Sequence, residues 1–120
     1  MVNILIADDA KFMRMMLKRI LEAEGHKIVG EASSGEEVIS LYAKLRPDLV
    51  TMDIVMPEPN GIDSVRKIRE FDPHAKIVMV TALGQEAMVV EALKVGASDF
   101  VIKPFKAGKV IQAIDKVLGA

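Results

Sequence analysis

Short apolar runs alternate along the chain with longer segments in which apolar side chains recur at helical spacing. The short runs are rich in Val, Ile and Leu, and they predict five β-strands at about residues 3–7, 27–32, 48–52, 76–80 and 99–102. The longer segments predict five helices, because apolar positions three or four residues apart form one face of a helix. This alternation is typical of βα units around a parallel sheet.

The ends of the predicted helices are marked by residues that start or stop a helix. The first helix follows Asp9 and ends at Gly25, the second begins near Gly35 and stops at Pro47, and the third covers residues 61–71. A polar stripe on the first helix consists of Lys11, Arg14, Lys18 and Glu22. The buried stripe expected for the last helix consists of Val110, Ile111, Ile114, Val117 and Leu118.

The number and order of these elements predict an α/β fold with a doubly wound, five-stranded parallel sheet. Right-handed crossovers and helices on both faces favour the flavodoxin-like (βα)5 arrangement with strand order 2-1-3-4-5. The run at 48–52 is almost continuously apolar, as expected for a central strand that is covered on both faces. An eight-stranded barrel would need about twice the 120 residues of this chain, so we expect one domain over residues 1–120.

Four of the apolar runs end at polar residues: Asp8 and Asp9, then Asp53, Thr81 and Lys103. In the predicted order the carboxyl ends of the strands lie along one edge of the sheet, where open α/β folds bind ligands. The three acids then converge from neighbouring strands. Adjacent strands are roughly 4.8 Å apart, so Thr81 lies one strand from Asp53, and Lys103 lies two strands away, within reach of its long side chain.

Three carboxylates at one site repel one another unless positive charge compensates them. Lys103 supplies one charge, and a weakly bound Mg²⁺, which prefers oxygen ligands, would supply the remainder. Asp53 lies between the acidic pair and the Thr/Lys pair, so it is the best candidate for a nucleophile that forms an aspartyl phosphate. The Thr81 hydroxyl and Lys103 would then contact the phosphoryl oxygens.

Taken in order along the chain, these motifs resemble the receiver domain of two-component response regulators. The resemblance is carried by Asp8-Asp9, by Asp53 with Met56-Pro57 and Asn60-Gly61 after it, by Thr81-Ala82 and by Lys103-Pro104-Phe105. It implies that Asp53 accepts a phosphoryl group from a histidine kinase. It also implies that Asp9, Asp53 and the main-chain carbonyl of Val55 ligate Mg²⁺, that Asp8 acts through water, and that Lys103 contacts the phosphoryl group.

The same resemblance implies a conformational switch and a set of partners. Thr81 would turn toward the phosphoryl group and Phe100 would swing inward behind it, which alters the face built from helix four, strand five and helix five. With no segment after the last helix, and with the run Phe12-Met13-Arg14, the chain is most similar to stand-alone, CheY-like chemotaxis receivers. The expected partners are a CheA-like kinase, a flagellar-motor or motility protein and a phosphatase.

Three positions depart from common receiver patterns or vary among them. Pro59 stands where an apolar residue such as Met is usual, Leu83 is apolar where many relatives are polar, and Phe100 lacks the hydroxyl of a Tyr. The lifetime of a phosphoryl group is therefore not predicted. A receiver of this kind is a signalling phosphoprotein rather than an enzyme, since it catalyses only its own phosphorylation and dephosphorylation.

Composition narrows the function further. The formal net charge is -1 with Lys and Arg scattered along the chain, which argues against nucleic-acid binding. The absence of Cys excludes disulfides and thiolate metal sites. No apolar run approaches membrane-spanning length, and the first residues lack a basic secretory region. We therefore expect a cytoplasmic protein. We also expect it to be a monomer.

Other interpretations remain open at this point. Taken singly, Asp9 and Thr81 are typical helix caps, and Lys103 could be a solvated surface lysine. A haloacid-dehalogenase-type phosphatase needs a DxD spacing, which adjacent Asp8-Asp9 does not provide. A flavodoxin-like electron carrier needs a hydroxyl-rich phosphate loop after the first strand, where this chain has acids. The remaining alternatives are a stand-alone receiver in a non-chemotaxis phosphorelay and a pseudo-receiver that binds partners without being phosphorylated.

Helix four is the candidate partner face outside this edge of the sheet. Its polar residues are spread around the helix, so some of its apolar residues should meet solvent; the candidates are Met88, Val89, Val90 and Val95. Five apolar residues of the first helix are expected in the core: Met13, Met16, Leu17, Ile20 and Leu21. His26 and His74 are expected at the surface.

Overall fold

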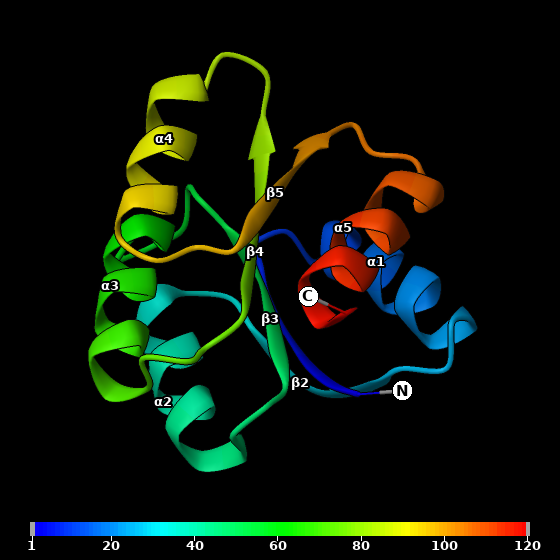
Figure 1. Cartoon of the computed structure of the whole chain (residues 1–120), viewed down its shortest axis with the longest axis horizontal. Coiled ribbons are helices and arrows are strands. Elements are labelled where there is room, and N and C mark those ends of the chain that lie inside the picture. The colour runs from blue at the N-terminus through cyan, green and yellow to red at the C-terminus, as the bar shows by residue number, and fades with distance from the viewer. Residues whose placement is uncertain (1, 120) are drawn as a thin grey trace.

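The sheet has five parallel strands, and the computed structural model describes residues 2–119 (Figure 1). The strands are β1 (Asn3–Ala7), β2 (Lys27–Ala32), β3 (Leu49–Asp53), β4 (Ile77–Ala82) and β5 (Asp99–Lys103). Their spatial order is β2-β1-β3-β4-β5, so the chain reverses direction across the sheet between β1 and β3. The predicted fold class and strand order are confirmed.

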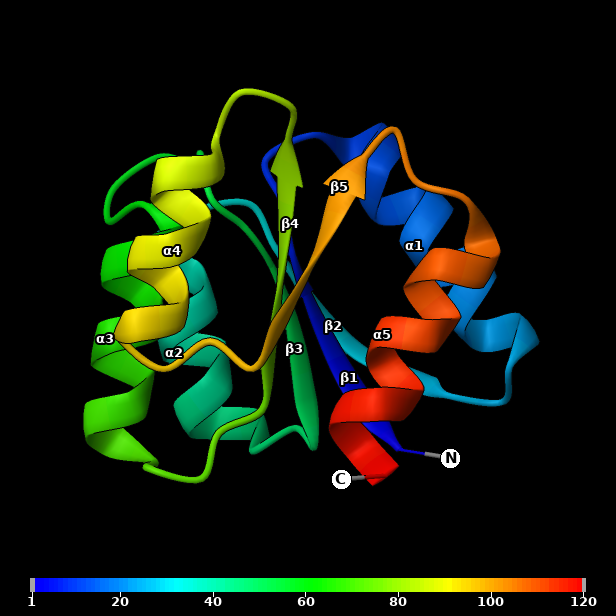
Figure 2. The same ribbon diagram turned by 45° about the horizontal axis from the view of Figure 1, so that its top comes forward.

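Helices cover both faces of this sheet (Figures 1 and 2). One face carries α1 (Lys11–Ala23) and α5 (Ala107–Gly119), and the other carries α2 (Gly35–Leu45), α3 (Gly61–Phe71) and α4 (Glu86–Lys94). The two layers explain why the strands read as nearly continuous apolar runs. In β1, Ile4 and Ile6 join the core beneath α1 and α5, whereas Leu5 and Ala7 join the core beneath α2 and α3.

Asp53, Thr81 and Lys103 lie within the strands whose apolar runs they end, whereas Asp8 and Asp9 follow β1. We predicted β3 at 48–52 and β4 at 76–80, but the structure shows Leu49–Asp53 and Ile77–Ala82. The predicted strands end too early because they stop at the last apolar residue, whereas parallel pairing continues beyond that residue. Asp53 pairs with Val80, and Lys103 pairs with Ala82. The strand ladders therefore fix the main chain of the candidate site.

Asp9 and Thr81, which taken singly are typical helix caps, do not cap helices in the structure. The N-cap of α1 is Ala10, whose main-chain N–H donates to Oδ1 of Asp8 at 2.8 Å, so Asp9 has no capping role. The N-cap of α4 is Gln85 rather than Thr81. Helix capping therefore does not account for the presence of Asp9 and Thr81 at this edge of the sheet.

Helix α4 exposes part of its apolar surface, as predicted. Met88 is 39% exposed and Val90 is 52% exposed, whereas Val89 is buried against the core. His74 is exposed, but His26 is half-buried, and its Nδ1 accepts a hydrogen bond from the main chain of Val2 at 3.3 Å. Among residues 2–119, the longest helices are far too short and too polar to cross a membrane.

Candidate functional site

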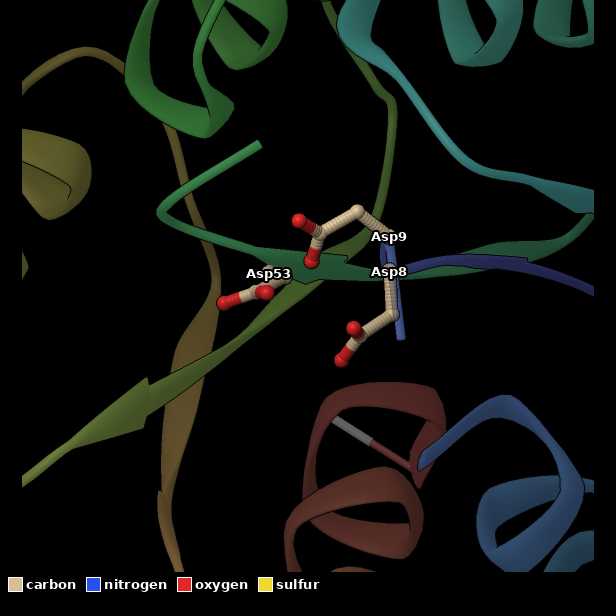
Figure 3. Close-up of side chains that lie close together, drawn as sticks. All are labelled: Asp8, Asp9 and Asp53. Atoms are coloured by element: carbon tan, nitrogen blue, oxygen red, sulfur yellow. The ribbon is translucent and has the colours of Figure 1, made fainter. Parts of the chain in front are cut away.

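The side chains of Asp8, Asp9 and Asp53 converge at the carboxyl ends of β1 and β3 (Figure 3). One carboxylate oxygen from each residue lies within 4.8 Å of the others. Asp8 is fully buried and Asp53 is 7% exposed, whereas Asp9 is exposed at the rim. The start of α3 packs so closely against this edge that a side chain at Gly61 would collide with the main-chain carbonyl of Asp53.

Lys103 crosses from β5 to the acidic cluster. Its Nζ lies 3.2 Å from Oδ2 of Asp8 and 3.5 Å from Oδ2 of Asp53. The lysine is half-buried, so the interpretation of a solvated surface lysine is wrong. One ammonium faces three carboxylates, and the cluster therefore keeps an excess of negative charge.

This excess charge makes Asp53 harder to ionise than an ordinary aspartate. Burial raises the pKa of Asp53 to about 6, and the neighbouring Asp8 carboxylate contributes in the same direction. The ammonium of Lys103 and the main-chain N–H of Val55 oppose this shift, and Asp9 adds to it. A second positive charge at this edge would favour the carboxylate that a nucleophile needs.

Replacing Lys103 with Met should raise the pKa of Asp53 above 6, because the substitution removes the largest influence that stabilises its charged form. The pKa is read from the carboxyl ¹³C shift of Asp53 during a pH titration without divalent metal. Lys109→Met removes the same charge from an exposed position on α5 and should leave the titration unchanged. An unshifted pKa in Lys103→Met would contradict the ion pairs described above.

The two residues expected to switch lie on β4 and β5, the strands next to β3 on the side of Lys103. Thr81 is buried on β4, and its Oγ1 donates to Oε1 of Gln85 at 2.7 Å. Phe100 is 37% exposed on β5. It pairs with Met79, two residues before Thr81, so Thr81 and Phe100 lie on the same face of the sheet, the one that α4 covers.

Two residues near the site were missed in the sequence. Arg14 was assigned to a polar surface stripe, but its Nη1 donates to the main-chain carbonyl of Asp8 at 2.7 Å, while its Nε pairs with Glu31 at 3.0 Å. Gln85 was interpreted only as a polar residue of helix four. Gln85 follows Thr81 by four residues, and this closeness is the signal in the sequence for their contact. The partner of Arg14 is a main-chain carbonyl, so the residue pattern carries no signal for that contact.

The acidic cluster fits a hard divalent cation. Its side-chain donors are carboxylate oxygens, which Mg²⁺ prefers, and Lys103 leaves their charge partly uncompensated. Asp9 leaves the cluster open to solvent at the rim, where a cation could retain water ligands. Asp8, Asp9 and Asp53 could therefore hold a metal ion.

Comparison with known proteins agrees with this geometry. The response regulator receiver domain family matches residues 4–115. The chain belongs to this family. The family resemblance proposed from the sequence is therefore confirmed, and the receiver's fold, acidic cluster and lysine can be considered together as parts of a signalling domain.

Individual relatives cover nearly the whole receiver. The chemotaxis protein CheY of Thermotoga maritima is 54% identical over 115 residues, which is 96% of each chain. Protein CcdB of Bacillus subtilis is 52% identical over 119 residues, which is 99% of each chain. CheY in the crystal structure of a CheX-CheY-BeF3-Mg complex from Borrelia burgdorferi is 39% identical, with a TM-score of 0.92 over 97% of this receiver and 88% of that chain.

Proposed function

We propose that this receiver is a phosphoryl-accepting switch of a two-component system and that Asp53 is the acceptor. The observation that carries the proposal is the position of the Asp53 carboxylate, at the carboxyl edge of the sheet between two other carboxylates and the Lys103 ammonium. A nucleophile with compensating positive charge beside it is what phosphoryl transfer requires of a protein.

The phosphoryl donor is a phosphohistidine of a histidine kinase. A carboxylate oxygen of Asp53 forms a bond to phosphorus as the phosphorus–nitrogen bond breaks, and the released imidazole nitrogen takes up a proton. Lys103 stabilises the negative charge on the transferred group. The switch is reset by hydrolysis. Water attacks phosphorus, the aspartyl–phosphate bond breaks, inorganic phosphate leaves with the protons of the water, and the Asp53 carboxylate is restored.

Mg²⁺ is the proposed cofactor, held by Asp9, Asp53 and the main-chain carbonyl of Val55, with Asp8 acting through water. When bound, the ion supplies positive charge to the phosphoryl oxygens. Asp8 also holds Lys103 in place through the 3.2 Å ion pair, and Arg14 fixes the main chain of Asp8 from α1. These contacts keep the acidic cluster ordered against its own repulsion.

The output of the switch is a change in the face formed by α4, β5 and α5, with Thr81 and Phe100 as the moving residues. A groove of about 690 Å³ lies along β5 and α5, and its lining includes Phe100, Ile102, Phe105, Lys106, Lys109 and Lys116. A lining of apolar side chains together with exposed lysines suits a partner segment that carries apolar and acidic side chains. Phe100 lines this groove, so its movement would change the groove directly.

Chemotaxis is the proposed setting, because the relatives named CheY match this receiver over nearly their full lengths. A CheA-like kinase would then phosphorylate Asp53 in the cytoplasm, a motility component would bind the output face, and a phosphatase would reset the switch. Protein CcdB of Bacillus subtilis is similarly close to this receiver and its name does not refer to chemotaxis, so a phosphorelay outside chemotaxis is the alternative. The acceptor chemistry is the same in both settings.

Incubation with acetyl phosphate and Mg²⁺ should add one phosphoryl group to the chain, measured as a phosphate-sized increase in intact mass. Removal of Mg²⁺ with a chelator should suppress the increase, because the carboxylates would then repel the incoming phosphate. An unchanged mass with Mg²⁺ present would contradict the proposal and favour a pseudo-receiver. Labelling that persists in the chelator would contradict the role of the metal.

A further inference from the structure

The hydroxyl of Thr81 is held by a single short hydrogen bond. Thr81 is 2% exposed, and its Oγ1 lies 2.7 Å from Oε1 of Gln85 and 3.4 Å from the main-chain carbonyl of Ala82. A threonine hydroxyl has one hydrogen to donate. The shorter and stronger of these contacts therefore commits that hydrogen to Gln85 rather than to the acidic cluster.

The orientation of the Gln85 amide follows from its two partners. The same Oε1 atom also accepts the main-chain N–H of Ala82 at 2.7 Å. An amide nitrogen could not accept this N–H, so the atom facing Thr81 must be the oxygen. The Gln85 oxygen is thus an acceptor for both partners, and Thr81 must be the donor.

Gln85 also forms the junction between the strand and the next helix. It is the N-cap residue of α4, yet its side chain caps no N–H of the helix and folds back to β4 instead. Its main-chain N–H donates to the Ala82 carbonyl at 3.3 Å, and Glu86 accepts the N–H of Gly84 at 3.3 Å. Hydrogen bonds from Gln85 to Ala82 and from Gly84 to Glu86 therefore hold the loop between β4 and α4 in one conformation.

We infer that Gln85 is a positioning residue that holds the Thr81 hydroxyl away from Asp53 and so opposes the phosphorylated state. This inference rests on the proposed function. To contact a phosphoryl group, Thr81 must give up its bond to Gln85, while the bond from Ala82 to Gln85 can persist and keep the start of α4 in place. The loss of one neutral hydrogen bond corresponds to about a fivefold change in an equilibrium constant.

Gln85→Met tests this inference, because Met has nearly the same length and lacks a comparable acceptor. Binding of beryllofluoride with Mg²⁺, a tetrahedral mimic of a phosphoryl group on a carboxylate, should become about fivefold tighter than in the wild type. Gln112→Met makes the same chemical change at an exposed position on α5 and should leave this affinity unchanged. An affinity in Gln85→Met that equals the wild-type value, or is weaker, would overturn the inference.

A second measurement needs no phosphoryl mimic. Three-bond NMR couplings to the Thr81 methyl group report its χ1 rotamer, which should be single in the wild type and averaged in Gln85→Met. Gln85→Glu keeps an acceptor at the same place and should retain the single rotamer, and Gln85→Ala replaces the Met variant if that one does not fold. Equal couplings in all variants would overturn the inference. Failure of the wild type to bind beryllofluoride would instead contradict the proposed function, while the couplings still test Gln85.

Discussion

Asp53→Asn should lower phosphoryl incorporation from acetyl phosphate by more than roughly 100-fold, because the amide removes the nucleophilic oxygen. Asn has the size and shape of Asp, so the packing of β3 and the approach of Gly61 are preserved. Asp8, Asp9 and Lys103 remain to bind metal and phosphate. The measurement is the fraction of protein that carries the phosphate-sized mass increase at a fixed time, with Mg²⁺ in excess.

The matched control is Asp115→Asn, which makes the same change at an exposed position on α5. It should incorporate phosphate at the wild-type rate. Peptide mapping of the labelled wild type should place the added mass on the peptide that contains Asp53. Labelling of Asp53→Asn at the wild-type rate, or added mass on another peptide, would show that Asp53 is not the acceptor.

Most of the fold could be predicted because the apolar pattern and the topology rules agree. The ranges predicted for β1 and β2 match the structure, and the order of the strands follows from right-handed crossovers. The carboxyl ends of β3, β4 and β5 were placed one or two residues too early. Asp53, Thr81 and Lys103 are polar, so the apolar pattern stops before them, but strand pairing continues.

The meeting of Asp8, Asp9, Asp53 and Lys103 also follows from the sequence, because strand order fixes which ends are neighbours and side-chain length fixes the reach. The direction of the Thr81 hydroxyl does not follow. It depends on one rotamer and on a side chain four residues later, which folds back from the start of α4. Arg14 was missed for a similar reason, since its partner is a main-chain carbonyl and leaves no mark in the residue pattern.

In the proposed switch, repulsion within the acidic cluster and the Thr81–Gln85 hydrogen bond would each oppose phosphorylation separately. Repulsion among the carboxylates acts before the metal and phosphate arrive, and the Thr81–Gln85 bond opposes the step that follows. The first effect depends on pH and metal, whereas the second depends on neither. Measurements without metal therefore isolate the cluster.

Asp53→Asn should stabilise the metal-free protein by about 3 kcal/mol at pH 7.5, since ionising Asp53 in the folded chain is unfavourable. Its pKa is about 6 in the folded protein and 3.8 for an ordinary aspartate, so the folded state holds the proton more tightly. The stability of the wild type should then fall as pH rises from 4 to 6 and should stay lower above 6. The free energy of unfolding is obtained from urea titrations in a chelator at several pH values.

The pH dependence distinguishes this electrostatic cause from better packing of Asn. Near pH 4 the folded wild type carries a neutral Asp53, so the difference between the two proteins should nearly vanish there. Asp115→Asn should show no such pH-dependent gain, because its carboxylate is exposed on α5. Mg²⁺ should reduce the advantage of Asp53→Asn at pH 7.5, because it stabilises the wild type more strongly. A gain of equal size at pH 4 and pH 7.5 would mean that repulsion within the acidic cluster is not its source.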